Sequence, residues 1–140
     1  MTVGKLCLFT AAVFSLATAI VLGQEHPAEP HHHVQGQKLK NPVPSTPASI
    51  ARGAELFAKT CSLCHGATGQ GDGKFAPEGS HPANFTDDVW QHGDSDGEIF
   101  YTIQNGIGPD FLMDTWQNVI SDEDIWSLVN YLKTLSATKK

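Results

Sequence analysis

Cysteine and basic side chains are both scarce in this chain. Its 140 residues include three Cys, and nine Lys and Arg stand against 15 Asp and Glu, which gives a formal net charge of −6. Phosphate binding needs clustered positive charge, so this balance argues against nucleic acid as a partner. From Gln24 onward the count is 8 basic and 15 acidic side chains, or −7. We therefore expect a protein partner that docks through a basic surface.

Long apolar runs are also scarce, and the single one stands at the N-terminus. It covers residues 6–22, follows Lys5 and ends at the small residue Gly23. This arrangement is typical of a signal peptide, residues 1–23, cleaved before Gln24. The run is short for a hydrocarbon core of ~30 Å, and a retained membrane anchor is the alternative. In either case the sequence predicts that the rest of the chain is exported, to the periplasm or onto its membrane face.

No alternating strand pattern occurs after residue 24, so the sequence predicts an all-α fold. Residues 24–47 are rich in His and Pro and are predicted to be a flexible linker. Residues 48–136 form the expected globular domain, and 137–140 a short tail. The run from His26 to His33 could bind a metal. We favour a solvated linker, because no neighbouring residue in the sequence completes a metal site.

About three main helices with long loops are expected in the globular part. The first begins near Thr46, with Pro47 in its first turn. The second begins with a capping-box pattern at residues 95–98 and ends at Asn105 and Gly106. The last opens at Ser121 with three acidic residues that complement the helix dipole. A glycine-rich segment, 66–73, lacks the preceding strand that a phosphate-binding loop needs, and it indicates tight turns or close backbone approach instead.

The motif with the clearest chemistry is Cys61-Ser62-Leu63-Cys64-His65, a C-x-x-C-H sequence. Two thiols at this spacing can add to the two vinyl groups of one haem, and the adjacent His then becomes an axial iron ligand. A disulfide across two residues would leave His65 unexplained. A thioredoxin-like pair expects a βαβ context, and a zinc site needs four ligands. The motif therefore predicts one covalently bound haem c.

The second axial ligand is predicted to be Met113, the only Met beyond the initiator. A soft thioether suits an electron-transfer haem with a raised potential. Met113 lies in a loop with no helical face to fill, well downstream of the motif, as a ligand from the opposite haem face must. His81 and His92 are the rival ligands.

With these motifs in place, residues 48–136 resemble the class I monohaem cytochromes c of bacterial electron-transfer chains. The resemblance rests on a first-helix pair, a last-helix pair, a glycine loop and a ligand loop: Gly53 and Phe57, Leu128 and Tyr131, Gly69-x-Gly71-Asp72-Gly73, and Met113-x-x-Trp116. It implies that the first and last helices cross at Gly53. The family usually carries Pro after the ligand Met, whereas this chain has Asp114.

The resemblance implies an all-α class I cytochrome c fold and a function in carrying single electrons between redox proteins. With His65 and Met113 on the iron, no position is open for O₂ or peroxide, so we expect an electron carrier and not an enzyme. One alternative is a haem c subunit dedicated to a membrane oxidase or dehydrogenase. The other is a five-coordinate haem enzyme such as a peroxidase, in which Met113 is not a ligand.

Overall fold

The structure, a computed structural model, describes residues 30–108 and 112–137. The predicted signal peptide and the first residues of the predicted linker lie outside this part of the chain, as does nearly all of the predicted tail. Within the described ranges, none of the helices combines the length and the apolar character needed to span a bilayer. All regular elements found in these ranges are helices, joined by long loops, as the sequence predicted.

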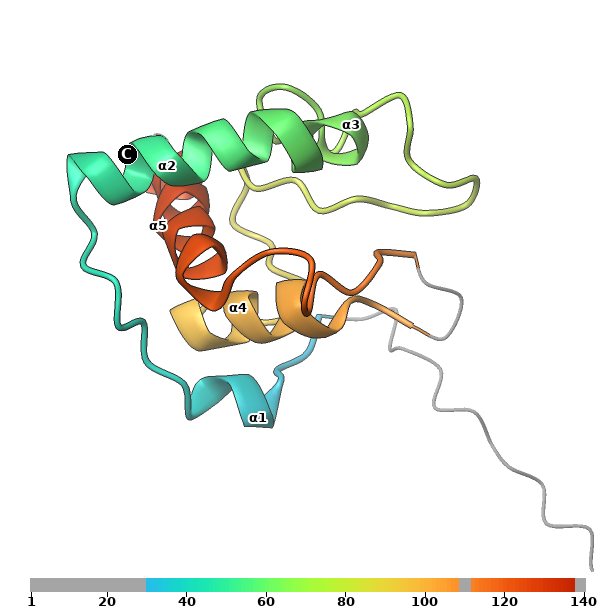
Figure 1. Cartoon of the computed structure of the whole chain (residues 1–140). Coiled ribbons are helices and arrows are strands. Elements are labelled where there is room, and N and C mark those ends of the chain that lie inside the picture. The colour runs from blue at the N-terminus through green and yellow to red at the C-terminus, as the bar shows by residue number, and fades with distance from the viewer. Residues whose placement is uncertain (1–29, 109–111, 138–140) are drawn as a thin grey trace, which may run out of the picture.

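One long helical rod forms the upper layer in Figure 1. It starts as α2 (Pro47–Leu56), passes through one turn of π-helix, η1 (Phe57–Cys61), and ends in α3 (Ser62–His65). Beneath it lie α5 (Asp122–Ala137), which packs against α2, and α4 (Asp96–Asn105), which packs against α5. The short α1 (Val34–Gln37) lies against α4 at the opposite edge from α2.

The predicted helix starts are confirmed by their capping contacts. Thr46 caps α2 by accepting from the backbone N–H of Ser49, and Pro47 occupies the first turn. At α4, Ser95 accepts from the backbone N–H of Glu98, and the Glu98 carboxylate accepts from the backbone N–H of Ser95. Because each cap satisfies donors that a helix end leaves unpaired, the local sequence is enough to set these boundaries.

The crossing of α2 and α5 depends on Gly53, as expected. A Cβ at this position would lie 2.8 Å from the Cβ of Tyr131 and closer still to the carbonyl oxygen of Ser127. Only a residue without a side chain lets the two helix backbones approach this closely. The contact fixes the rod over α5 and thereby fixes where the C-x-x-C-H motif lies.

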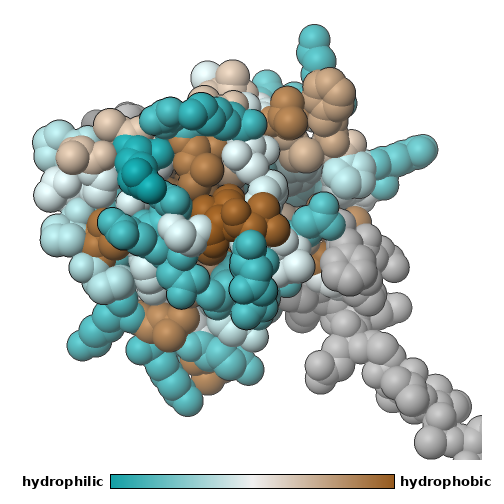
Figure 2. Space-filling model, in the orientation of Figure 1, coloured by the Kyte–Doolittle hydropathy of each residue, from teal (hydrophilic) through white to brown (hydrophobic). Residues whose placement is uncertain are grey.

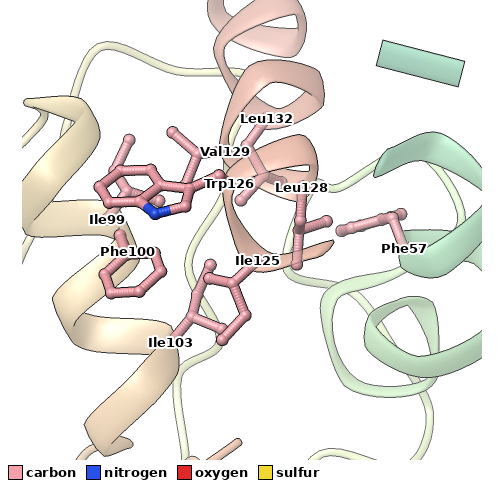
Figure 3. Packing of buried hydrophobic residues seen from close by; sticks show 9 residues of the cluster. All are labelled: Phe57, Ile99, Phe100, Ile103, Ile125, Trp126, Leu128, Val129 and Leu132. Carbon is pink, nitrogen blue, oxygen red and sulfur yellow. The ribbon is translucent and has the colours of Figure 1, made fainter. Parts of the chain in front are cut away.

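The hydrophobic core lies between α4, α5 and the start of η1 (Figure 3). Phe100 of α4 stacks on Trp126 of α5, with ring centroids 3.9 Å apart. On the other side of α5, Leu128 points toward Phe57 of η1. All nine side chains of this cluster are buried: Phe57, Ile99, Phe100, Ile103, Ile125, Trp126, Leu128, Val129 and Leu132. The core therefore joins the rod to both lower helices.

Part of the predicted linker, from residue 30 onward, lies within the described residues. It packs on the domain through α1, where Gly36 is buried and lies against the backbone of Gly97 and Glu98. Asn41 also donates to the side chain of Asn130 at 2.9 Å. The sequence pattern missed this packing because it depends on backbone contact at two glycines and on polar contacts, which leave no apolar periodicity.

Candidate functional site

The C-x-x-C-H motif lies at the end of the helical rod, where Cys61, Cys64 and His65 all line one cavity of about 570 Å³. Cys61 closes the π-helical turn and Cys64 lies in α3. π-helical turns are rare and occur mostly where a helix carries a functional side chain. The cavity volume lies in the ~300–1,000 Å³ range of sites for small molecules and cofactors.

The glycine-rich segment folds back over the motif. The backbone N–H of Gly71 donates to the carbonyl of His65 at 2.8 Å, and that of Gly73 donates to the carbonyl of Cys64 at 3.1 Å. These bonds satisfy carbonyl groups that the end of α3 leaves free. Gly71 has a φ of +78°, and a Cβ there would strike the carbonyl oxygen of Pro82. This loop is therefore a backbone clamp on the motif, as its sequence indicated.

His65 is held in one orientation by two contacts. Its Nδ1 lies 3.1 Å from the carbonyl oxygen of Ala83, and its ring stacks on Phe85 with centroids 4.7 Å apart. A carbonyl can only accept, so Nδ1 carries the proton and Nε2 keeps the lone pair that a metal needs. Burial lowers the pKa of His65, against a smaller opposing effect of the hydrogen bond to Ala83. His65 is therefore neutral at neutral pH, which is its metal-binding form.

Cys61 and Cys64 are free thiols, not a disulfide. Burial raises the pKa of Cys61 to about 12, with a smaller contribution from Cys64. Reactive redox cysteines have lowered pKa values, so this environment argues against a thioredoxin-like pair. It fits thiols that lie against an apolar ligand.

Met113 lines the same cavity as His65. It is half-buried and packs against the core, and the carbonyl oxygen of Met113 accepts from the backbone N–H of Ile107 at 2.8 Å. A small adjoining cavity of about 20 Å³ is also lined by Cys61, His65 and Met113. The sequence-predicted site residues are thus brought together from η1, from α3 and from the loop after α4.

The two rival ligands, His81 and His92, also line the large cavity. Neither lines the adjoining small cavity that His65 and Met113 share. His81 is exposed, whereas His92 is half-buried and lies beside His31. This arrangement favours Met113 as the residue facing His65.

The rest of the cavity wall is mainly apolar. It includes core side chains of α4 and α5, namely Ile99, Ile103 and Leu132. Apolar side chains also gather near the middle of the face shown in Figure 2, between α2 and α4, with polar side chains around them. An apolar hollow with a few placed polar groups is typical of a cofactor site. The wall and the donor set of two thiols, an imidazole and a thioether fit a haem.

Two parts of this site were missed by the sequence reasoning. The Ala83 carbonyl orients His65, but a backbone acceptor has no residue signature. Phe85 stacks on His65, and Trp90 lies next to Phe85 with ring centroids 5.7 Å apart. Their aromatic character was the available signal, but it becomes specific only once the loop is folded beside the motif.

Comparisons with known proteins agree with this geometry. Residues 48–132 match the family described as cytochrome C oxidase, cbb3-type, subunit III. The chain is 32% identical over 99 residues to the cbb3-type cytochrome c oxidase subunit FixP of Azorhizobium caulinodans, covering 71% of this chain and 31% of that protein. It is 39% identical over 62 residues to the subunit CcoP of Azospirillum brasilense, covering 44% of this chain and 19% of that one.

Solved structures give the same fold. A chain of the Kuenenia stuttgartiensis reducing HAO-like protein complex superposes with a TM-score of 0.61 at 26% identity, covering 67% of this chain and 46% of that one. Cytochrome CL of Methylophaga aminisulfidivorans gives a TM-score of 0.53 at 23% identity, covering 64% of this chain and 57% of that one. The all-α cytochrome c fold is thereby confirmed. The chain spans less than a third of the length of the curated relatives it matches.

Proposed function

The chain belongs to the family of cbb3-type cytochrome c oxidase subunit III, and from this membership we propose that it is a haem c protein that delivers single electrons to an oxidase of that type. The observation that supports this function best is the single cavity lined by Cys61, Cys64 and His65 together with Met113. The dedicated-subunit alternative is thus preferred to a free carrier, because the relatives are named as oxidase subunits.

The four residues have separate roles in this proposal. Cys61 and Cys64 would hold one haem through thioether bonds, and His65 and Met113 would bind its iron. When bound, the haem supplies a one-electron couple between ferrous and ferric iron. The backbone bonds of Gly71 and Gly73 hold the motif in place, and core side chains of α4 and α5 form the cavity wall.

The surrounding residues tune this site without taking part in bond changes. Ala83 keeps the proton on Nδ1 of His65, and Phe85 fixes the plane of the imidazole ring. The apolar wall excludes water, which lowers the local dielectric. Met113 bound to the iron would leave no position for an exogenous ligand, which supports a carrier and not a peroxidase.

The net negative charge of the domain indicates which kind of partner surface it would bind. Residues 48–136 hold 4 basic and 13 acidic side chains, or −9. Such a field attracts a positively charged surface and speeds the encounter at low ionic strength.

The proposed location is the periplasm, with a membrane-anchored chain facing the periplasm as the alternative.

Covalent attachment is tested by acid-acetone extraction of the purified protein. Haem absorbance should remain with the polypeptide in the unaltered protein, and the double variant C61A/C64A should release it. Ser62→Ala is the matched control, because it changes a residue inside the motif but removes neither thiol. Free extraction of haem from the unaltered protein would overturn the proposed function.

Axial ligation is tested by comparing Met113→Ala with His81→Ala. Met113→Ala should keep the haem, lower its potential and bind carbon monoxide, because removal of the thioether opens the iron. His81→Ala should keep the spectrum and the poor carbon monoxide binding of the parent protein. If the two variants behave the other way round, His81 and not Met113 is the ligand.

Delivery to the oxidase is tested with the pre-reduced protein and a purified cbb3-type oxidase. Oxidation should follow the oxidase concentration and slow with added salt, because opposite charges steer the encounter. Bovine serum albumin in place of the oxidase is the control. A rate no faster than with O₂ alone would reject the oxidase as acceptor while leaving the haem assignment intact.

A further inference from the structure

Three imidazoles meet at the edge of the domain, outside the set of residues assigned to the haem. His31 and His33 come from the N-terminal segment, and His92 comes from the loop before α4. One ring nitrogen of each lies within 4.8 Å of the other two. Nε2 of His31 is 3.3 Å from Nε2 of His33, and 3.5 Å from Nδ1 of His92. The site thus joins residues 61 positions apart in the sequence.

These distances match those between ligands of one metal ion. Zn²⁺ binds imidazole nitrogen at ~2.0–2.1 Å with tetrahedral angles, which places two ligand nitrogens about 3.3 Å apart. The His31–His33 and His31–His92 separations agree with this value. Hydrogen bonds between neutral imidazoles can also give these distances, so binding of Zn²⁺ itself is what separates the two arrangements.

The backbone presents the three rings to each other. In extended chain, side chains of residues i and i+2 lie on the same face and the intervening one lies on the opposite face. Accordingly His32 turns away from the cluster, and its Nδ1 pairs with the Glu98 carboxylate at 2.8 Å. The backbone N–H of His31 donates to the carbonyl of Gln91 at 2.9 Å, directly before His92. These two contacts hold the N-terminal segment that carries His31 and His33 beside the loop that carries His92.

We propose that His31, His33 and His92 form a binding site for a divalent transition-metal ion, with Zn²⁺ as the expected occupant. Imidazole is a ligand that suits Zn²⁺, Cu²⁺ and Ni²⁺, and three protein ligands leave a fourth position for water. All three side chains are half-buried, so the ion would be reachable from solvent. In this proposal His92 supplies the ligand that the sequence around the His run lacks.

Bound metal would tie the N-terminal segment to the haem domain. His92 also lines the haem cavity, whereas His31 and His33 belong to the segment that leads into α1. A ligand that binds only the folded state stabilises it by mass action. The metal therefore acts as a clip between the segment and the edge of the cavity.

The test is a calorimetric titration of the full-length, haem-loaded protein with Zn²⁺ alone. We expect one strong site per chain, and a melting temperature that rises by about 10 °C when Zn²⁺ is 100-fold above its dissociation constant. His92→Gln should weaken binding at least ~10–100-fold, because loss of even a supporting partner of a metal ligand has an effect of that size. The haem spectrum checks that this variant is folded.

His32→Gln is the matched control, since it removes the central imidazole of the same run but none of the three ligands. Its zinc affinity should stay within a few-fold of the parent value. The proposal is overturned if Zn²⁺ does not bind. It is also overturned if His92→Gln binds as tightly as the parent protein, or if His32→Gln weakens binding as much as His92→Gln, since either result indicates a nonspecific His run.

Discussion

Replacement of Gly53 by Ala tests the helix crossing that positions the haem motif, because two physical effects predict opposite signs. Ala is favoured over Gly in a helix by about 1 kcal/mol, so propensity alone predicts a more stable protein. In the structure, however, the added Cβ would lie 2.8 Å from the Cβ of Tyr131 and would overlap the carbonyl oxygen of Ser127. The obstructing atoms are backbone and Cβ, so rotamer changes cannot relieve the clash.

The magnitude follows from moving α2 away from α5. Overpacking of this kind destabilises a fold by up to about 3 kcal/mol, and the higher helix propensity of Ala offsets about 1 kcal/mol of this. The free energy of unfolding should therefore fall by about 2 kcal/mol. For a domain of this size that corresponds to a melting temperature lower by about 10 °C.

The assay is thermal unfolding of the haem-loaded protein, followed by far-ultraviolet circular dichroism. Gly108→Ala is the matched control, because a Cβ at Gly108 meets no atom of the residues that the structure describes within 4 Å. Its stability should change by no more than ~0.5 kcal/mol. A Gly53→Ala protein as stable as the parent, or more stable, would show that the helices do not touch at this residue.

Three further predictions concern charge. Burial by itself would raise the pKa of Glu98, but hydrogen bonds from Ser95, His32 and Gln37 hold this pKa below its ordinary value. The ionised carboxylate therefore stabilises the fold above the unfolded pKa of ~4.3, and this stabilisation is lost as pH falls through the lower folded pKa. Thermal unfolding at a series of acidic pH values should show that Glu98→Gln lacks this pH-dependent stabilisation. Asp114 is exposed, so its charge would act on a bound haem through water. For an assumed separation of ~8 Å and a dielectric of ~80 the interaction is ~0.5 kcal/mol, and Asp114→Asn should raise the midpoint potential in a redox titration by ~20 mV. A fall in potential would show that the carboxylate does not act on the iron through charge. Reduction by a cationic small redox reagent should slow with added salt while reduction by an anionic one speeds up, and equal responses would place the acidic charge away from the haem edge.

Much of the fold follows from local sequence signals. The boundaries of α2 and α4 are set by Thr46 and Ser95, whose side chains cap the first turn within the same few residues. The C-x-x-C-H motif names three candidate site residues because its chemistry depends on spacing along one helix. The scarcity of Met left Met113 as the natural thioether candidate, and the structure brings it to the cavity that the motif lines. The crossing at Gly53 was implied by family resemblance, and the structure supplies its steric reason.

Other features depend on contacts between distant segments and have no local signature. The Ala83 carbonyl orients His65 through a backbone atom, which any residue at that position would supply. The predicted linker packs on α4 through Gly36, whose lack of a side chain reads in sequence as flexibility but in the fold permits close approach.

The His run shows the division most clearly. By itself the sequence determined that residues 31–33 carry imidazoles and that alternate residues of an extended chain share a face. Only the tertiary structure decided that His92 lies beside His31, because that contact joins loops 61 positions apart and depends on how α1 and α4 pack. A metal site needs ligands converging from several directions within about 2 Å of one point, and such convergence is a property of the folded chain.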